Sequence, residues 1–131
     1  MKRRLERKFK VKSKRIQNSF KYAFSGFATS FKEERNMRFH ILAIIIVAIC
    51  GIYFNISRFE WIICTILFAL VVSAELINTA IENVADMISQ EKNPKIKVIK
   101  DVSAAAVLVN AIASIIVGLI IFLPKFQNLI L

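Results

Sequence analysis

Glycine, proline and cysteine are scarce in this sequence, which has three glycines, two prolines and two cysteines among 131 residues. The glycines, Gly26, Gly51 and Gly118, lie too far apart to form a glycine-rich phosphate loop. A nucleotide site of the P-loop or protein-kinase type is therefore excluded. Both cysteines lie inside apolar runs, so we interpret Cys50 and Cys64 as small buried hydrophobic residues and not as a disulfide or a metal-binding pair.

Acidic residues are scarce in the first part of the chain. Residues 1–38 contain 13 lysines and arginines against three glutamates, whereas the remaining 93 residues contain six basic and six acidic residues. The net charge of +10 therefore belongs to the N-terminal segment. Such a segment can bind nucleic acid or an anionic membrane surface. We favour the membrane and expect no nucleic-acid partner, because apolar runs follow directly and each basic residue near anionic lipid adds about 1 kcal/mol of attraction.

Three apolar segments are candidates to cross a bilayer, at about 39–57, 61–88 and 101–123. A crossing helix needs about 20 residues, so the first segment must include polar residues at both ends. We expect the third segment to end at Pro124, because proline interrupts a helix. Strands are not expected, because an open sheet cannot lie in lipid. The predicted fold is an all-α membrane protein with three transmembrane helices and an N-terminal amphipathic interfacial helix, in one domain of residues 15–125.

The segment 15–35 carries the amphipathic pattern. A basic helix with an aromatic stripe typically lies in the plane of the membrane interface, and a soluble helix packed on a partner is the alternative. Residues 1–14 form a basic arm whose charge density predicts disorder, and the tail 126–131 supports no prediction. The apolar positions recur at spacings of four, four, three and four residues, at Ile16, Phe20, Phe24, Phe27 and Phe31.

The distribution of lysine and arginine in the short loops predicts the orientation. The N-terminal arm is strongly basic, and the loop 87–100 contains four lysines, whereas the loop 55–60 contains one arginine and the C-terminal tail one lysine. We therefore expect a multi-pass protein of the cell membrane. Its N-terminus and second loop would lie in the cytoplasm, and its first loop and C-terminus would lie outside.

Polar residues gather on one face of the helix that contains the second apolar segment. At 100° per residue, five polar groups fall within an arc of about 100°. One interpretation is that this part of the helix has emerged into water and its acidic groups are solvated. Against this, the opposite face is apolar, and unpaired acids one or two turns apart repel each other. Carboxylates with a carboxamide suit Mg²⁺, which prefers oxygen ligands and often binds together with phosphate. The five residues are Glu75, Asn78, Thr79, Glu82 and Asp86.

Further polar groups are expected at the same depth. Glu34 precedes the first apolar segment, and Lys100 and Asp101 open the third. In the predicted topology all of these places lie at the cytoplasmic boundary. A divalent metal, a phosphate-binding cation and an interfacial helix where a lipid can approach are the parts that phosphoryl transfer to a lipid needs, because that chemistry depends mostly on positioning and charge neutralisation.

Two motifs resemble the bacterial integral-membrane diacylglycerol kinase family: Glu75-Leu-Ile-Asn-Thr-Ala-Ile-Glu82-Asn-Val-Ala-Asp86, and Lys100-Asp101-Val-Ser-Ala-Ala-Ala-Val. A third, Phe31-Lys-Glu-Glu34-Arg-Asn36-Met-Arg-Phe-His40, is similar to the Gram-positive form of the family, whose preferred lipid is undecaprenol. The resemblance covers roughly residues 15–125. His40 and the longer basic arm depart from the diacylglycerol form and favour the polyprenol substrate.

The resemblance implies roles for individual residues. The residue that matches Glu75 is the general base on the lipid hydroxyl, and Asn78 matches an active-site asparagine. Those that match Glu34 and Glu82 hold Mg²⁺ together with the phosphates of ATP. The family is trimeric, so a homotrimer is expected. The positions that match nucleotide contacts are Arg15, Tyr22, Glu91, Asn93, Lys100 and Asp101, and among them Lys100 matches a phosphate contact.

The predicted function is transfer of the γ-phosphate of ATP to a membrane lipid alcohol, with undecaprenol giving undecaprenyl phosphate. A diacylglycerol kinase that makes phosphatidic acid is the nearest alternative. A small oligomeric transporter or proton pathway is another, but a relay would be expected to carry ionisable groups across the whole span. An adaptor with simple membrane anchors would leave the polar face of the second span without a role.

Overall fold

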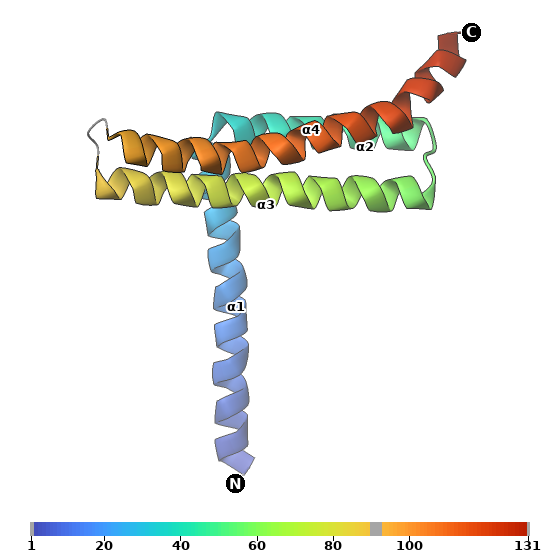
Figure 1. Cartoon of the computed structure of the whole chain (residues 1–131). Coiled ribbons are helices and arrows are strands. Elements are labelled where there is room, and N and C mark those ends of the chain that lie inside the picture. Colours follow the sequence, from blue (N-terminus) through green and yellow to red (C-terminus); the bar gives the residue numbers. More distant parts are fainter. Residues whose placement is uncertain (1, 90–92, 131) are drawn as a thin grey trace. The chain divides into compact units, whose positions relative to one another are not determined.

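The computed structural model describes residues 2–89 and 93–130, with side chains described from residue 11 onward. These residues form four helices and no strand (Figure 1). Three of the helices are long and apolar enough to cross a membrane. The predicted all-α membrane fold is therefore confirmed. The helices are α1 (Lys2–Glu33), α2 (Arg35–Tyr53), α3 (Arg58–Ile88) and α4 (Pro94–Ile130).

The first of two compact units is α1. The helix begins at Lys2, ahead of the start predicted at residue 15, and so includes the basic arm for which the charge density predicts disorder. Lysine and arginine are good helix formers, which is consistent with the earlier start. Within this helix Ile16, Phe20 and Phe24 are exposed. A surface location for α1 in the membrane interface stays a prediction.

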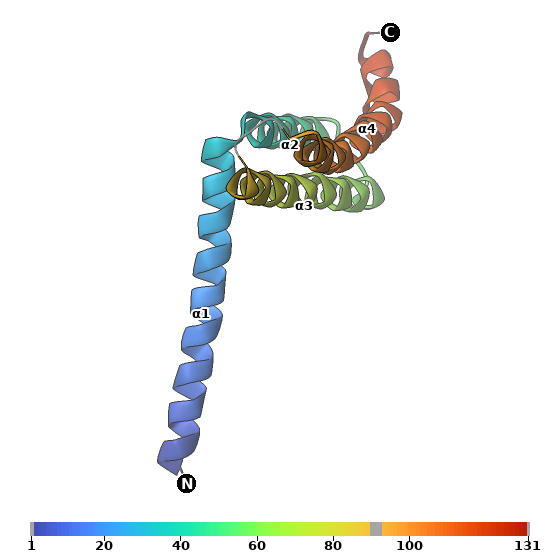
Figure 2. The same ribbon diagram turned by 60° about the vertical axis from the view of Figure 1, so that its left-hand side comes forward.

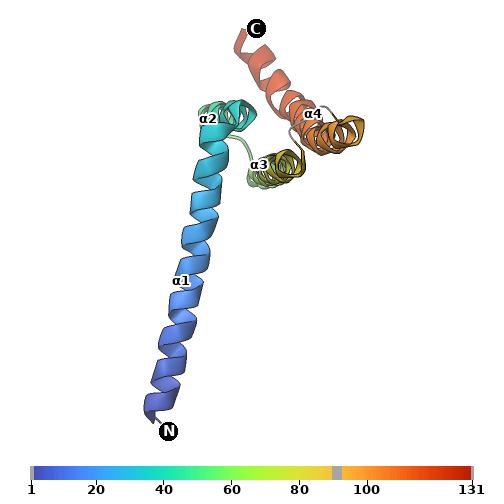
Figure 3. The same ribbon diagram turned by 90° about the vertical axis from the view of Figure 1, so that its left-hand side faces the viewer.

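The second compact unit contains α2, α3 and α4. Contacts with α3 join the unit, since α3 packs closely against α4 along its length and more sparsely against α2. Figure 2 and Figure 3, which show the chain from two other sides, place α3 next to both of the other helices. A buried apolar cluster lies at the end of the unit where α2 connects to α3. It consists of Ile56, Cys64, Ile121 and Phe122, with Trp61 and Phe54 packed against it, and both cysteines of the chain are free.

A tight turn joins α2 to α3. Ile56 N donates to Gly51 O at 3.1 Å, and Asn55 adopts a positive φ of 49°. Gly51 is needed here for close approach, because a Cβ at this position would lie 2.8 Å from two ring carbons of Trp61. The indole therefore packs directly on the backbone of α2 and fixes where α3 begins.

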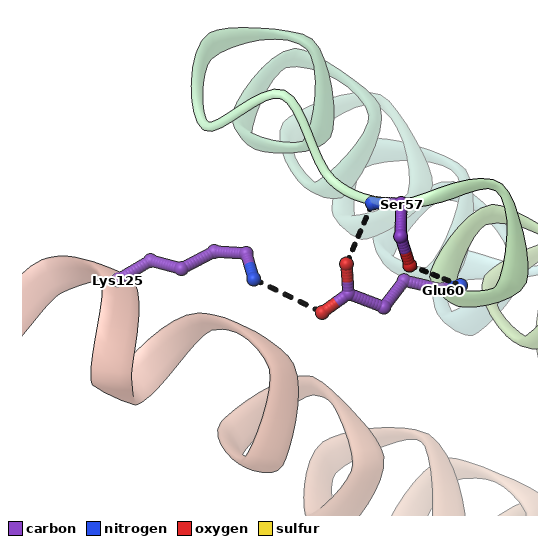
Figure 4. A network of polar contacts seen from close by, with 3 residues as sticks. All are labelled: Ser57, Glu60 and Lys125. Atoms are coloured by element: carbon purple, nitrogen blue, oxygen red, sulfur yellow. Dashed lines mark hydrogen bonds and ion pairs between the residues drawn. The ribbon is translucent and has the colours of Figure 1, made fainter.

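The first turn of α3 is capped and tied to α4 (Figure 4). Ser57 Oγ accepts from Glu60 N at 3.2 Å, and Glu60 Oε2 accepts from Ser57 N at 2.7 Å. This reciprocal pair satisfies two backbone donors that a helix start otherwise leaves open. The other carboxylate oxygen, Glu60 Oε1, accepts from Lys125 Nζ at 3.0 Å. The start of α3 is thus joined to the C-terminal part of α4.

The expectation that Pro124 ends the last helix is wrong, because α4 continues to Ile130 with Pro124 inside it. Proline lacks the N–H for one helical hydrogen bond and clashes with the preceding turn, so a helix that continues through proline bends. The C-terminal end of α4 turns away from the rest of the helix (Figure 1). The bend leaves Lys125 able to reach Glu60.

Candidate active site

The polar face of α3 points into the protein. Glu75 is 0% exposed, Asn78 is 4% and Thr79 is 5%. The interpretation that this face is solvated is therefore wrong for these three residues. Only at the end of the stripe does a side chain reach the surface, since Asp86 is exposed.

The hydrogen bonds of this face leave several buried polar atoms without a partner. Thr79 Oγ1 donates to Glu75 O at 2.9 Å, and Asn78 Nδ2 donates to Glu82 Oε1 at 3.3 Å. Within the described part of the chain, no partner exists for either carboxylate oxygen of Glu75, for Asn78 Oδ1 or for Ser103 Oγ. A buried polar group without a hydrogen bond is costly. These atoms therefore mark a place that is built for a polar ligand.

A cavity of about 520 Å³ lies beside this face and is lined by all three helices of the second unit. Its volume is in the range of small-molecule sites. From α4, small side chains leave the space open, at Ala104, Ala105 and Ala111. The polar residues that line it are Asn36 and His40 from α2, Glu75 and Asn78 from α3, and Asp101 from α4.

Two further carboxylates act on Glu75. Glu34, the residue before α2, and Glu82, on α3, both interact electrostatically with it. Negative charges on these three carboxylates repel one another, and a bound cation would relieve the repulsion. Among the described residues no group of three or more metal-binding side chains forms a closed metal site. Mg²⁺ is commonly held by one or two carboxylates together with phosphate oxygens, so Glu34 and Glu82 are a donor set that fits it.

The basic residue Lys100 faces this acidic group from α4. Its ammonium group pairs with Asp86 on α3, and Lys100 also interacts electrostatically with Glu82. The next residue, Asp101, pairs with Lys97 one turn earlier on the same helix. Three glutamates, a carboxamide and a lysine are therefore linked by these interactions in the second unit.

An apolar groove of about 590 Å³ continues from the cavity between α2, α3 and α4. The two share Phe39, His40 and Ala111. Beyond these residues the lining is apolar apart from two cysteines and Ser114, whose hydroxyl donates to Asn110 O at 2.9 Å. A polar pocket with a buried carboxylate thus opens into a long apolar groove.

Comparison with known proteins identifies the family. Residues 21–122 match the family described as prokaryotic diacylglycerol kinase. The chain is 43% identical over 111 residues to the undecaprenol kinase of Bacillus subtilis (strain 168), covering 85% of this chain and 90% of that protein. It is 34% identical to the diacylglycerol kinase of Synechocystis sp. (85% of this chain, 64% of that protein) and 32% identical to that of Pseudomonas aeruginosa (71% and 76%). The chain belongs to the prokaryotic diacylglycerol kinase family. It is an ATP-dependent lipid kinase, as its motifs predicted.

For four predicted nucleotide contacts of this kinase, the structure gives no contact with the site described above. Arg15 and Tyr22 are exposed on α1, in the first unit. Glu91 lies outside the described residues. Asn93 precedes α4, and its Oδ1 accepts from Lys95 N at 2.9 Å, so it has a capping role there. The contacts of these four residues with ATP stay predictions.

Ser103 is a buried polar residue that the sequence did not single out, between the pocket residues Asp101 and Ala104. It is buried on α4, and its hydroxyl, like Asn78 Oδ1, finds no partner in the described ranges. Its position three residues after Lys100, on the helix face that meets α3, is the signal that could have indicated it. The apolar groove gave no such signal, because its shape depends on which small side chains face each other across three helices.

Proposed function

We propose that this kinase transfers the γ-phosphate of ATP to the hydroxyl of undecaprenol and so makes undecaprenyl phosphate. The observation that carries the proposal is the buried carboxylate of Glu75, unpartnered in the described chain, at the place where a polar pocket meets an apolar groove. The Bacillus subtilis relative, which is named undecaprenol kinase, supports the choice of lipid.

The lipid chain lies in the apolar groove in this proposal. Undecaprenol has one polar group, and the rest of the molecule is hydrocarbon, which matches a groove whose lining beyond His40 is almost entirely apolar. Diacylglycerol would place two ester groups there. Ser114 already donates its hydroxyl to the backbone, so the esters would be desolvated without a hydrogen-bond donor from this residue. The alternative occupant of the groove is a helix of a second copy of the chain.

The reacting hydroxyl lies beside Glu75, which accepts its proton as the oxygen attacks the γ-phosphorus. The new O–P bond forms while the bond from the γ-phosphorus to the bridging oxygen breaks, and ADP leaves with that oxygen. An alcohol is a very weak acid, so the proton moves to Glu75 late in the transition state. Asn78 holds Glu82 through its amide, and its own carbonyl oxygen remains available to the reactants.

The triphosphate lies between α3 and α4, where acidic and basic groups face each other. Glu34 and Glu82 would hold Mg²⁺, which when bound supplies charge neutralisation for the phosphates. Lys100 exchanges its partner Asp86 for a phosphate oxygen. Asp101 and the four predicted contacts Arg15, Tyr22, Glu91 and Asn93 bind the rest of the nucleotide.

A homotrimer in the cell membrane completes the proposal, with the N-terminus and the active site on the cytoplasmic side. The basic α1 lies in the interface of that leaflet, where anionic lipid attracts it. The family resemblance supports the trimer. Chemical cross-linking in native membranes tests it, because a ladder that ends at the dimer would contradict a trimer.

Purified protein in mixed micelles tests the function directly. We expect transfer of labelled phosphate from ATP to undecaprenol in clear preference to diacylglycerol. Glu75→Gln should lower the rate at least about 100-fold, since it removes the general base. Glu60→Gln is the matched control on the same helix, and it should retain the rate, because it lies at the far end from the pocket. Preference for diacylglycerol would contradict the lipid assignment, and a normal rate for Glu75→Gln would contradict the role of this residue.

A further inference from the structure

We propose that His40 binds the hydroxyl of the lipid substrate and donates a hydrogen bond to its oxygen. This inference rests on the proposed function and adds a residue that positions the hydroxyl of the lipid in the pocket. It starts from the position of His40 on α2, one turn after Asn36, where its side chain is half-buried and lines both the pocket and the groove.

His40 is the polar residue at the junction of the two spaces. The other residues common to both, Phe39 and Ala111, have no polar side-chain atom. A lipid alcohol whose chain fills the groove and whose hydroxyl reaches Glu75 must pass this junction. The hydroxyl and the first carbons of the chain therefore lie next to the imidazole.

The hydrogen-bonding groups of the pocket need a donor at this point. A hydroxyl has one O–H to donate and two lone pairs. Its O–H goes to Glu75, which as a carboxylate can only accept. Asn78 gives one of its two amide N–H groups to Glu82, and Asp101 is an acceptor paired with Lys97. His40 in its neutral form has one N–H, and among the three residues shared by the pocket and the groove it is the one whose side chain can donate a hydrogen bond.

The three interactions of the hydroxyl oxygen are then all assigned. Its proton is given to Glu75, one lone pair accepts from His40, and the other lone pair attacks the γ-phosphorus. An acceptor (Glu75) and a donor (His40) on the same oxygen would fix the direction of its attack, and correct orientation of reacting groups contributes a large part of such rate enhancements. His40 is a binding residue in this account, and Glu75 remains the base.

A matched pair of variants tests this role. His40→Leu removes the donor, whereas His40→Gln keeps an amide N–H. We expect His40→Leu to lose about tenfold in kcat/KM for undecaprenol, the cost of one hydrogen bond to the reacting group, with KM for ATP unchanged. His40→Gln should stay within about threefold of the unmodified protein. Tyr53→Phe, an exposed change near the end of α2, controls for general effects on that helix.

An isoprenoid hydrocarbon without a hydroxyl, used as a competitive inhibitor, separates hydroxyl binding from groove shape. We expect it to inhibit the unmodified protein and both variants of His40 equally well. The inference is overturned if His40→Leu has normal kcat/KM, if the two variants are equally impaired, or if His40→Leu weakens the hydrocarbon as much as the alcohol. If the unmodified protein phosphorylates no lipid alcohol at all, the proposed function fails instead.

Discussion

Gly51→Ala is the sharpest test of how α2 and α3 meet. The added Cβ would lie 2.8 Å from Cη2 and from Cζ2 of Trp61, and 3.1 Å from Cδ1 of Ile56. Real Cβ contacts are not this short, so the indole must move out of its place against the buried cluster. Overpacking of this kind typically costs about 1–3 kcal/mol. The better helix propensity of alanine offsets up to about 1 kcal/mol of this.

A net loss of about 1–2 kcal/mol corresponds to a fall of roughly 5 °C in the melting temperature of the protein in detergent micelles. Gly118→Ala is the matched control, because it also replaces a helical glycine but its Cβ meets nothing within 4 Å. We expect its melting temperature to be unchanged or slightly higher. Equal melting temperatures for the two variants would refute the reasoning.

A double variant identifies the clash. Phenylalanine is smaller than tryptophan and lacks the outer part of the indole that the new Cβ would meet, so Trp61→Phe should relieve the overpacking. Trp61→Phe alone leaves a cavity and destabilises. In combination with Gly51→Ala the two losses should therefore sum to less than their separate values. Strict additivity would show that the Cβ does not meet the indole.

Two further variants address the two ends of the second unit. Glu82→Ala should raise the Mg²⁺ concentration needed for half-maximal kinase activity, because it removes one of the two proposed ligands; an unchanged Mg²⁺ titration would argue against that role. Lys125→Gln breaks the ion pair with Glu60, whose partners are 28% and 23% exposed. It should lower the melting temperature by roughly 2–4 °C without changing kcat/KM, and a loss of activity at low temperature would contradict a purely structural role.

Much of the fold follows from periodicity in the sequence. The apolar runs and the 100° spacing of the polar residues predicted three crossing helices and one polar face on α3, and Glu75, Asn78 and Thr79 do share a buried face. The predicted end of α4 was wrong. We expected proline to terminate the helix, whereas a helix can continue past a proline with a bend.

The start of α3 has a sequence motif that we did not use in predicting the helix, whereas two other features have no motif in the sequence. Ser57-Arg-Phe-Glu60 has the spacing of a capping box, which marks the start of α3. The contact between Gly51 and Trp61 could not be predicted, since it depends on the turn that brings α3 back along α2. The apolar groove could not be predicted either, because its shape depends on how the side chains of three packed helices leave space between them.

An ion pair at each end of the α3–α4 hairpin fixes the register of the two helices. Asp86 pairs with Lys100 near the pocket, and Glu60 pairs with Lys125 at the other end. To slide one turn, about 5.4 Å, the helices would have to break both contacts at once. Either ion pair can therefore keep the two helices aligned while the other is open, as when Lys100 leaves Asp86 for a phosphate oxygen.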